Sequence, residues 1–181
     1  MICPQLRNLA HRVLVVVDEM KILQITEEIY PEIARIYQQG LNSGIATFET
    51  EVPNWQTWNE KFLPYARIAV EVNGEIGGWA ALTPISKRKV YDLVNEVSIY
   101  ISKDLQGKGV GKFLFHELIV ASESHGVYSL QSVIFSENTN SVKLHTACGF
   151  RIIGFREKVA QRNGIWHDNI LMERRSKIIG I

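Results

Sequence analysis

Cysteine is scarce in this chain of 181 residues, which holds only Cys3 and Cys148. The two lie far apart, so they have neither the spacing of a metal-binding pair nor the number that a disulfide framework needs. The five histidines also lack the HxxxH or HExxH spacing of metal ligands; they are His11, His116, His125, His145 and His167. We therefore expect no dedicated metal site, and a reducing compartment such as the cytoplasm.

Long apolar runs and an excess of charge are also missing. No apolar run approaches the roughly 18 residues that indicate a membrane span. Lysine and arginine number 20 against 19 acidic residues, a formal net charge of +1, and this balance offers no basic face for nucleic acid. With 46% hydrophobic and 22% charged residues, the composition is that of a globular domain. We expect a small-molecule substrate and neither a nucleic-acid nor a membrane partner.

The length allows one domain with a full core. The first regular pattern begins at Met20, so we expect a catalytic domain over residues 20–176 and a short tail over 177–181. Residues 1–19 form an extension, either a tail or the product of an upstream start codon. Its apolar run at residues 13–17 could add an edge strand. Asp18 and Glu19 follow where a signal peptide would have its small-residue cleavage site, so the segment is not read as a signal peptide.

Hydrophobic periodicity and turn signals predict the order of the elements. Thr26 is a candidate N-cap and Gly40 a candidate helix stop, while Asn73-Gly74 is a strong hairpin signal. The expected strands are 21–25, 67–72, 75–82, 95–101, 127–135, 151–159 and 166–173, and the expected helices are 26–39, one opening at 53–54, 110–125 and 138–147. This order predicts one mixed α/β sheet with helices on its faces.

The most informative segment is the glycine-rich loop Gln106-Gly107-Lys108-Gly109-Val110-Gly111. It follows an alternating strand that carries Glu96, and it opens directly into a helix. Glycines let backbone N–H groups converge on one ligand, and a helix N-terminus adds a positive dipole end. The loop therefore predicts a site for a phosphorylated cofactor, with Lys108 or Lys112 as auxiliary charge.

Two other glycine-loop ligands fit poorly. A P-loop needs Ser or Thr after its lysine, but Phe113 follows Lys112. A dinucleotide-binding fingerprint needs a third glycine where Lys112 stands. Taken alone, the loop could still be an ordinary turn that enters a helix.

Four segments together carry a family resemblance. Gln106, Gly109 and Gly111 fit the pattern Gln/Arg-x-x-Gly-x-Gly/Ala. Residues 46–50 read Ala-Thr-Phe-Glu-Thr, residues 137–150 fit Glu-Asn-x-x-Ser-x-x-Leu-His-x-x-x-Gly-Phe, and residues 164–172 fit Gly-x-Trp-x-Asp-x-x-x-Met. Over residues 20–175 the chain thus resembles the GNAT superfamily of acetyl-CoA-dependent N-acetyltransferases, and more closely its phosphinothricin acetyltransferase-like branch.

The resemblance implies the GNAT fold, a single mixed and largely antiparallel sheet flanked by helices, with a V-shaped split between central strands. It implies acetyl-CoA as co-substrate, no metal, and a homodimer, which the branch often forms. It also implies a set of cofactor-binding residues: Ile99, Tyr100, Ile101, Gln106, Gly107, Lys108, Gly109, Val110, Gly111, Lys112, Asn138 and Ser141. Asn138 could also be a helix N-cap, and the two roles are compatible.

Glu96 is the expected general base, because an ammonium acceptor must lose a proton before its nitrogen can attack a thioester. The alternative is a strand glutamate that only faces solvent. His145 stands where many relatives carry a tyrosine thought to protonate the departing thiolate, so it is the expected thiolate partner. The alternative is local packing. Backbone N–H groups near Ile99 would stabilise the oxyanion.

The expected acceptor pocket is formed by Thr47, Phe48, Glu49, Trp79, Arg88 and Tyr91. Arg88 could bind an acidic group of the acceptor bidentately, or it could be a solvated loop arginine. The branch commonly differs at Asp92, Leu93 and Val97, and before the last tryptophan. We expect transfer to a small amino-acid-like amine of the phosphinothricin or methionine sulfone/sulfoximine type. Acetylation of a protein or peptide amine and a non-catalytic CoA-binding sensor are the alternatives.

Overall fold

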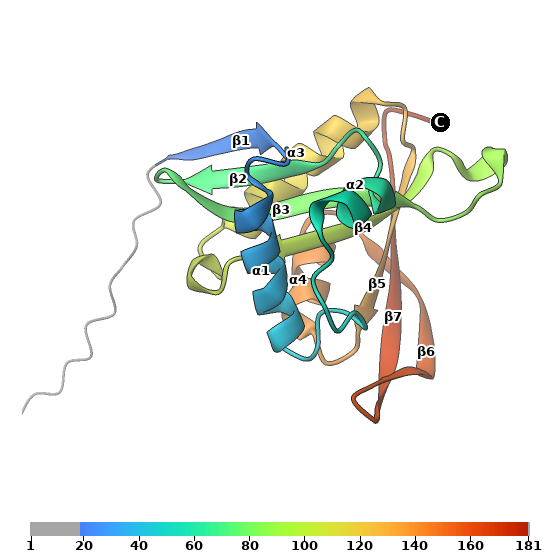
Figure 1. Ribbon diagram of the computed structural model, residues 1–181. Coiled ribbons are helices and arrows are strands. Elements are labelled where there is room, and N and C mark those ends of the chain that lie inside the picture. Colours follow the sequence, from blue (N-terminus) through green and yellow to red (C-terminus); the bar gives the residue numbers. More distant parts are fainter. Residues whose placement is uncertain (1–18, 181) are drawn as a thin grey trace, which may run out of the picture.

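The computed structural model describes residues 19–180, which form one seven-stranded sheet with helices on both faces (Figure 1). The expected edge strand at residues 13–17 lies outside the described residues. The elements are β1 (Met20–Gln24), α1 (Tyr30–Asn42), α2 (Trp55–Lys61), β2 (Ile68–Val72), β3 (Glu75–Pro84), η1 (Lys89–Tyr91), β4 (Val94–Ile101), η2 (Lys103–Leu105), α3 (Val110–Ser124), β5 (Ser129–Phe135), α4 (Thr139–Ala147), β6 (Arg151–Arg162) and β7 (Ile165–Arg175).

The strand order is β1-β2-β3-β4-β5-β7-β6. Every neighbouring pair is antiparallel except β4 and β5, which run parallel. The β2–β3 hairpin turns at Asn73 and Gly74, whose φ angles of 51° and 87° are the left-handed values that such a tight turn requires. The prediction of a mixed, largely antiparallel sheet is confirmed.

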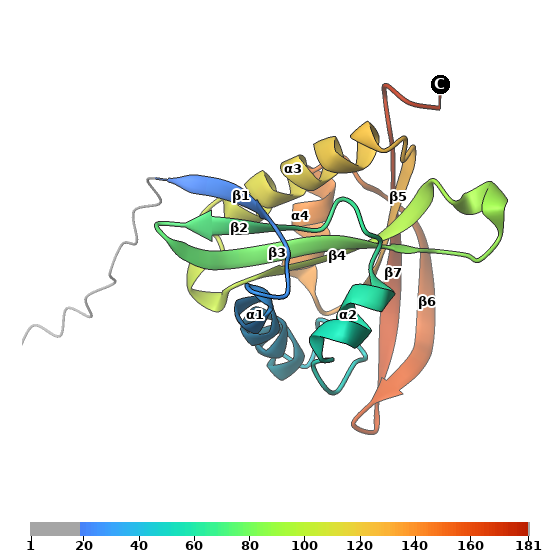
Figure 2. The same cartoon turned by 45° about the horizontal axis from the view of Figure 1, so that its top comes forward.

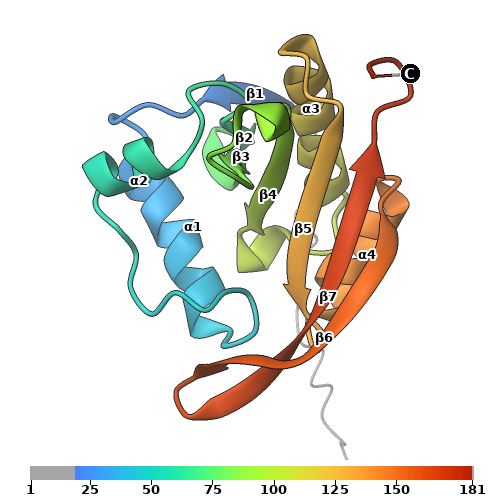
Figure 3. The ribbon, with the colours of Figure 1, turned by 90° about the vertical axis from the view of Figure 1, so that its right-hand side faces the viewer.

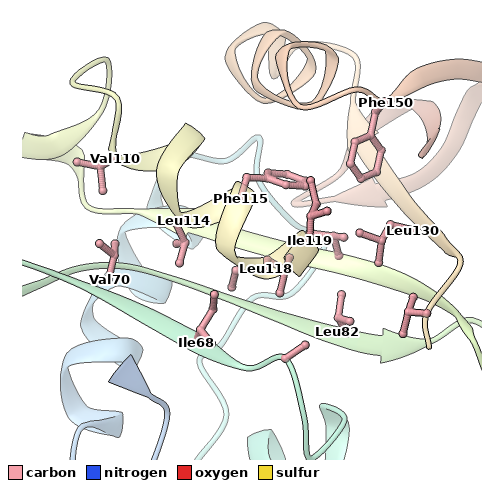
Figure 4. Close-up of a cluster of buried hydrophobic side chains, with 14 of the residues drawn as sticks. Ile68, Val70, Leu82, Val110, Leu114, Phe115, Leu118, Ile119, Leu130 and Phe150 are labelled. Carbon is pink, nitrogen blue, oxygen red and sulfur yellow. The ribbon is translucent and has the colours of Figure 1, made fainter. Parts of the chain in front are cut away.

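The helices divide into two layers (Figure 2). Helices α3 and α4 cover one face of the sheet, where α3 buries Leu114, Phe115 and Leu118 against Ile68 and Leu82 (Figure 4). Helices α1 and α2 cover the opposite face with a separate cluster that contains most of the buried aromatic rings. Because side chains alternate along a strand, each central strand contributes to both layers.

Helix α1 differs from its prediction at both ends. It begins at Tyr30, not after Thr26, and it continues through Gly40 to Asn42. A Cβ on Gly40 would lie 2.6 Å from ring atoms of Tyr100. Gly40 therefore does not end the helix. It is the position at which the helix approaches β4 too closely for any larger side chain.

We expect Gly40→Ala to lower the free energy of unfolding by up to about 2 kcal/mol, because overpacking costs about 1–3 kcal/mol and the helix-propensity gain of about 1 kcal/mol offsets only part of it. The Tyr100 ring has little room to move, since it stacks on Trp79 at 4.8 Å. Urea denaturation measures the change. The exposed neighbour variant Gln38→Ala should change stability by less than about 0.5 kcal/mol, and a stabilised Gly40→Ala protein would contradict the packing argument.

A split opens in the centre of the sheet. Strands β4 and β5 pair only over Val94–Glu96 and Ser129–Gln131, and beyond this junction their ribbons separate (Figure 3). β4 continues to pair with β3 as far as Ile101, and β5 continues to pair with β7 as far as Phe135. Residues 97–101 and 132–135 therefore present strand edges that face each other without pairing.

Candidate functional site

A cavity of about 300 Å³ lies in this split. Both unpaired strand edges line it, together with the connection after α1 and helix α4. Its polar and aromatic lining residues are Tyr37, Thr47, Phe48, Glu49, Lys61, Thr83, Glu96, Ser98, Tyr100, Ser132, Phe135, Asn138, Ser141, His145 and Asn169. The cavity brings together side chains from α1, α2, β3, β4, β5, α4 and β7.

Glu96 lies at the narrow end of the split, where β4 and β5 still pair. It is opposite Gln131 on β5 and Thr83 on β3. Burial raises the pKa of the Glu96 carboxyl above its usual value of 4.5, and the nearby Lys61 ammonium partly opposes this rise. A carboxylate with a raised pKa is a better proton acceptor than an exposed one, which suits a general base.

Lys61 and Glu49 form an ion pair at the acceptor side of the cavity. Lys61 is the last residue of α2, and its Nζ lies 2.8 Å from Glu49 Oε1. Both side chains remain about half exposed, at 42% and 52%. A pair this exposed contributes little to stability, so the two charges remain available to a ligand.

Three hydroxyl groups hold the Ala46–Glu49 connection against β4. Tyr37, Tyr100 and Thr47 hydrogen-bond one another through their side chains, and the Tyr37 and Tyr100 rings lie 4.8 Å apart. Burial raises the pKa of both tyrosines, so both stay protonated near neutral pH. Neither tyrosine is therefore a candidate base.

An aromatic contact closes the opposite wall. The Phe48 ring lies 4.4 Å from Phe135 on β5, and Phe135 stacks on His167 of β7 at 4.5 Å. His167 Nδ1 in turn lies 3.0 Å from a Glu137 oxygen.

Asn138 caps α4 by accepting a hydrogen bond from the Ser141 N–H, and it donates another to the Ile45 carbonyl. The N-cap alternative for Asn138 is confirmed.

His145 lies on the α3 side of the cavity, with its ring edge-on to Phe115 and Phe150. Burial lowers the pKa of His145 from 6.5 to about 4, so the ring is neutral at pH 7. Its Nδ1 lies 2.8 Å from the Ser141 carbonyl oxygen, which can only accept, so Nδ1 carries the proton. Nε2 then presents a lone pair. In this form the ring accepts a hydrogen bond there and has no proton to give.

Three buried polar atoms along the cavity have no hydrogen-bond partner within the described residues. They are Ser132 Oγ, His145 Nε2 and Asn169 Oδ1. Each residue is at most 3% exposed. Buried polar groups are nearly always paired in folded proteins, so these atoms mark places where a bound ligand or water completes the hydrogen bonding.

The glycine loop continues the split beyond Ile101. Gln106 Nε2 donates to the Ile101 carbonyl at 3.2 Å and anchors the loop to β4. Gly107 and Gly109 have φ angles of 74° and 85°. Gly109 is the N-cap of α3 and makes no side-chain cap, and the first turn of α3 carries no acidic residue. The first N–H groups of this helix are therefore available to an anion.

The structure brings many of the predicted site residues to the cavity and leaves others away from it. Those in the lining are Glu96, His145, Ile99, Tyr100, Asn138, Ser141, Thr47, Phe48 and Glu49. Ile101 and the loop residues Gln106, Gly107, Lys108, Gly109, Val110, Gly111 and Lys112 lie further along the split, and the Val110 side chain is buried in the core, which leaves only its backbone for a ligand.

Three predicted acceptor residues do not reach the cavity. Trp79 is fully buried in the aromatic cluster of the α1 and α2 layer, where its ring packs against those of Tyr37, Trp58 and Tyr100. Arg88 and Tyr91 lie at the exposed β3–β4 connection, where the guanidinium is 5.6 Å from the tyrosine ring. None of the three lines the cavity.

Eleven residues of the cavity lining were not predicted from the sequence, among them Lys61, Thr83, Ser98, Ser132 and Asn169. Strand alternation places Ser98 on the same face of β4 as Glu96, so a signal for it existed. Lys61 is the last residue of α2, and only the packing of that helix over the sheet brings it near Glu96.

Two general features of residues 19–180 are also established. No helix among them is long and apolar enough to cross a membrane. The same residues contain no group of three or more His, Cys, Asp or Glu side chains placed to hold a metal ion.

Comparison with known proteins gives consistent relatives. The model of the acetyltransferase (GNAT) family matches residues 26–150. The chain is 33% identical to a phosphinothricin N-acetyltransferase of Alcaligenes faecalis over 83% of this chain and 79% of that protein. It is 29% identical to an L-methionine sulfoximine/L-methionine sulfone acetyltransferase of Pseudomonas paraeruginosa over 79% of this chain and 87% of that protein.

Two solved structures share the fold. A putative acetyltransferase from Salmonella typhimurium, solved with its cofactor acetyl-CoA, superposes with a TM-score of 0.81 at 24% identity over 90% of this chain and 96% of that one. A GNAT superfamily phosphinothricin acetyltransferase from Sinorhizobium meliloti, in complex with acetyl-CoA, superposes with a TM-score of 0.74 at 24% identity over 89% of this chain and 95% of that one.

Proposed function

The chain belongs to the GNAT acetyltransferase family, and on this premise we propose that it transfers an acetyl group from acetyl-CoA to the amine of a small amino-acid-like acceptor. The observation that carries the proposal is a half-buried carboxylate, Glu96, at the narrow end of a split whose two edges are unpaired. Relatives named for phosphinothricin and for methionine sulfone support the acceptor class.

The residues along the split fit acetyl-CoA. The free edge of β4 from Val97 to Ile101 has backbone N–H and C=O groups to pair with the amides of an extended pantetheine arm. The start of α3 and the positive-φ glycines before it offer backbone N–H groups to a diphosphate. Lys108 and Lys112 add positive charge. The bound cofactor supplies the activated acetyl group.

Glu96 acts as general base. It takes a proton from the acceptor's ammonium group, directly or through one water, and so leaves a neutral nitrogen that can attack. Its raised pKa comes from partial burial. N–H groups on the free edge of β4 near Ile99 are the donors for negative charge that develops on the acetyl oxygen.

His145 acts as a fixed hydrogen-bond acceptor. Because Nδ1–H is held by the Ser141 carbonyl and the ring is neutral, Nε2 binds and orients a donor such as a water molecule. Ser132 Oγ, which is also buried and unpartnered, is a second polar group on this side. As the C–S bond breaks, a water held here relays to the departing thiolate the proton that the attacking nitrogen releases, so the imidazole itself gives none up.

The protein is proposed to act in the cytoplasm as a homodimer. The scarcity of cysteine supports a reducing compartment. Strand β6 is an outer edge of the sheet, and Ile152, Phe155 and Trp166 on β6 and β7 are each more than half exposed. Large exposed apolar side chains that gather on one hairpin are typical of a contact surface.

Purified protein mixed with acetyl-CoA and a panel of amines tests the proposed function. Thiol release should appear with amino-acid-like acceptors such as methionine sulfone, and the product should carry one acetyl group on nitrogen by mass spectrometry. Tight binding of acetyl-CoA without turnover of any amine would instead support a CoA-binding sensor.

A further inference from the structure

The charges of the cavity complement a zwitterion. Among the described residues that line it, Lys61 is the only one with a permanent positive charge, and Glu49 and Glu96 are the two carboxylates. An amino-acid acceptor carries an ammonium group and a carboxylate a few bonds apart. The ammonium must reach Glu96 for its proton to be removed, which leaves the carboxylate in need of a cation nearby.

Lys61 is placed to supply that cation. It ends α2 on the acceptor side of the sheet, where it lines the same cavity as Glu96 and acts electrostatically on its carboxyl. Its Nζ lies 2.8 Å from Oε1 of Glu49, which lines the same cavity. An ammonium has three donors, so a second carboxylate can bind beside Glu49.

The expected acid-binding residue, Arg88, lies elsewhere. It flanks η1 at the β3–β4 connection, near Tyr91, and does not line the cavity. The cation that could bind an acidic group inside the cavity therefore comes from α2 and not from that connection.

We propose that Lys61 binds the acidic group of the acceptor and thereby selects amino acids over simple amines. The proposal rests on the proposed function and names the residue that sets its substrate class. Lys61 is a specificity-determining residue in this role, because it holds the end of the acceptor that does not react.

The test compares two acceptors that differ in one group, methionine sulfone and its carboxamide. Steady-state kinetics are measured for the wild type and for Lys61→Met, which keeps most of the apolar stem and removes the charge. We expect the variant to raise KM for the acid by about 10- to 100-fold, the loss of one charge-assisted hydrogen bond, with kcat little changed. KM for the carboxamide should change by less than about threefold, because no charged partner is lost with it.

Two further variants make the result specific. Lys21→Met removes an exposed lysine on β1 and should leave both KM values unchanged. Arg88→Met tests the rival residue and should also leave the ratio of the two KM values unchanged. Thermal denaturation of each variant reports whether it is folded.

The possible outcomes separate the two proposals. Three outcomes would overturn the role of Lys61 while leaving an active acetyltransferase. They are equal KM values for acid and carboxamide in the wild type, a ratio of these two KM values that Lys61→Met does not change, and a selective effect of Arg88→Met on KM for the acid. No turnover of any amino-acid-like amine by the wild type would overturn the proposed function itself.

Discussion

Replacing Glu96 with glutamine is expected to lower kcat/KM for the acceptor amine by about 10²- to 10⁴-fold, the range that general-base catalysis contributes. The carboxamide keeps the shape of the side chain but cannot accept a proton. Acetyl-CoA binding should be unchanged, since the glycine loop and the start of α3, which are proposed to hold the diphosphate, lie further along the split. Thiol-release kinetics measure the first quantity and isothermal titration calorimetry the second.

The pH profile distinguishes a base from a structural residue. Because burial raises the pKa of Glu96, kcat/KM of the wild type should rise with pH through an apparent pKa above 4.5, and Glu96→Gln should lose this rise. Lys61 lowers the pKa of Glu96, so Lys61→Met should move the rise to higher pH.

A matched control is Glu75→Gln, at the exposed start of β3. It removes the same charge far from the split and should leave both the rate and the pH profile unchanged. If Glu96→Gln kept the wild-type rate and profile, Glu96 would not be the base.

Acid is expected to destabilise the protein through His145. The pKa of this histidine is about 4 when folded and 6.5 in its ordinary state. A lowered folded-state pKa contributes stability that is fully present above pH 6.5 and is lost as the pH falls toward 4, since the unfolded chain binds the proton more readily. The loss from this residue is about 3 kcal/mol, at about 1.4 kcal/mol for each pH unit.

His145→Phe isolates this contribution. A phenyl ring fits the edge-on contacts with Phe115 and Phe150, and it cannot titrate. The free energy of unfolding from urea denaturation at several pH values between 4 and 7 should fall less steeply for the variant than for the wild type. His116→Gln changes an exposed histidine, whose side chain is 72% accessible, and should keep the wild-type slope. Parallel slopes for wild type and His145→Phe would contradict the assignment.

Local sequence patterns predicted the elements well and their tertiary roles less well. The hairpin at Asn73-Gly74, the N-cap Asn138 and the loop that enters α3 each depend on a few neighbouring residues, and all appear in the structure. Gly40 was predicted to end a helix because glycine often stands just after a helix. What constrains this position is the close approach to Tyr100, sixty residues away, which no local pattern contains.

The acceptor half of the site shows the same limit. Trp79 was expected in the pocket, but the side of β3 on which it lies is filled by α1 and α2. Lys61 was not expected there, because α2 is a short helix whose path across the sheet depends on Trp58 packing against distant rings. The residues proposed to hold the cofactor's diphosphate follow one another along the chain. The residues on the acceptor side come from separate elements and meet only when the helices pack on the sheet.

The unpaired edges of β4 and β5 also bear on how the protein avoids unwanted association. A bare strand edge is a template for any passing strand. Here the two bare edges face each other inside the molecule, with the Ala46–Glu49 connection on one side and α4 on the other. The catalytic opening therefore adds no outward-facing edge. Of the described strands, only β1, with five residues, and β6, with twelve, remain at the margins of the sheet, so the longer of these is where pairing with another chain would begin.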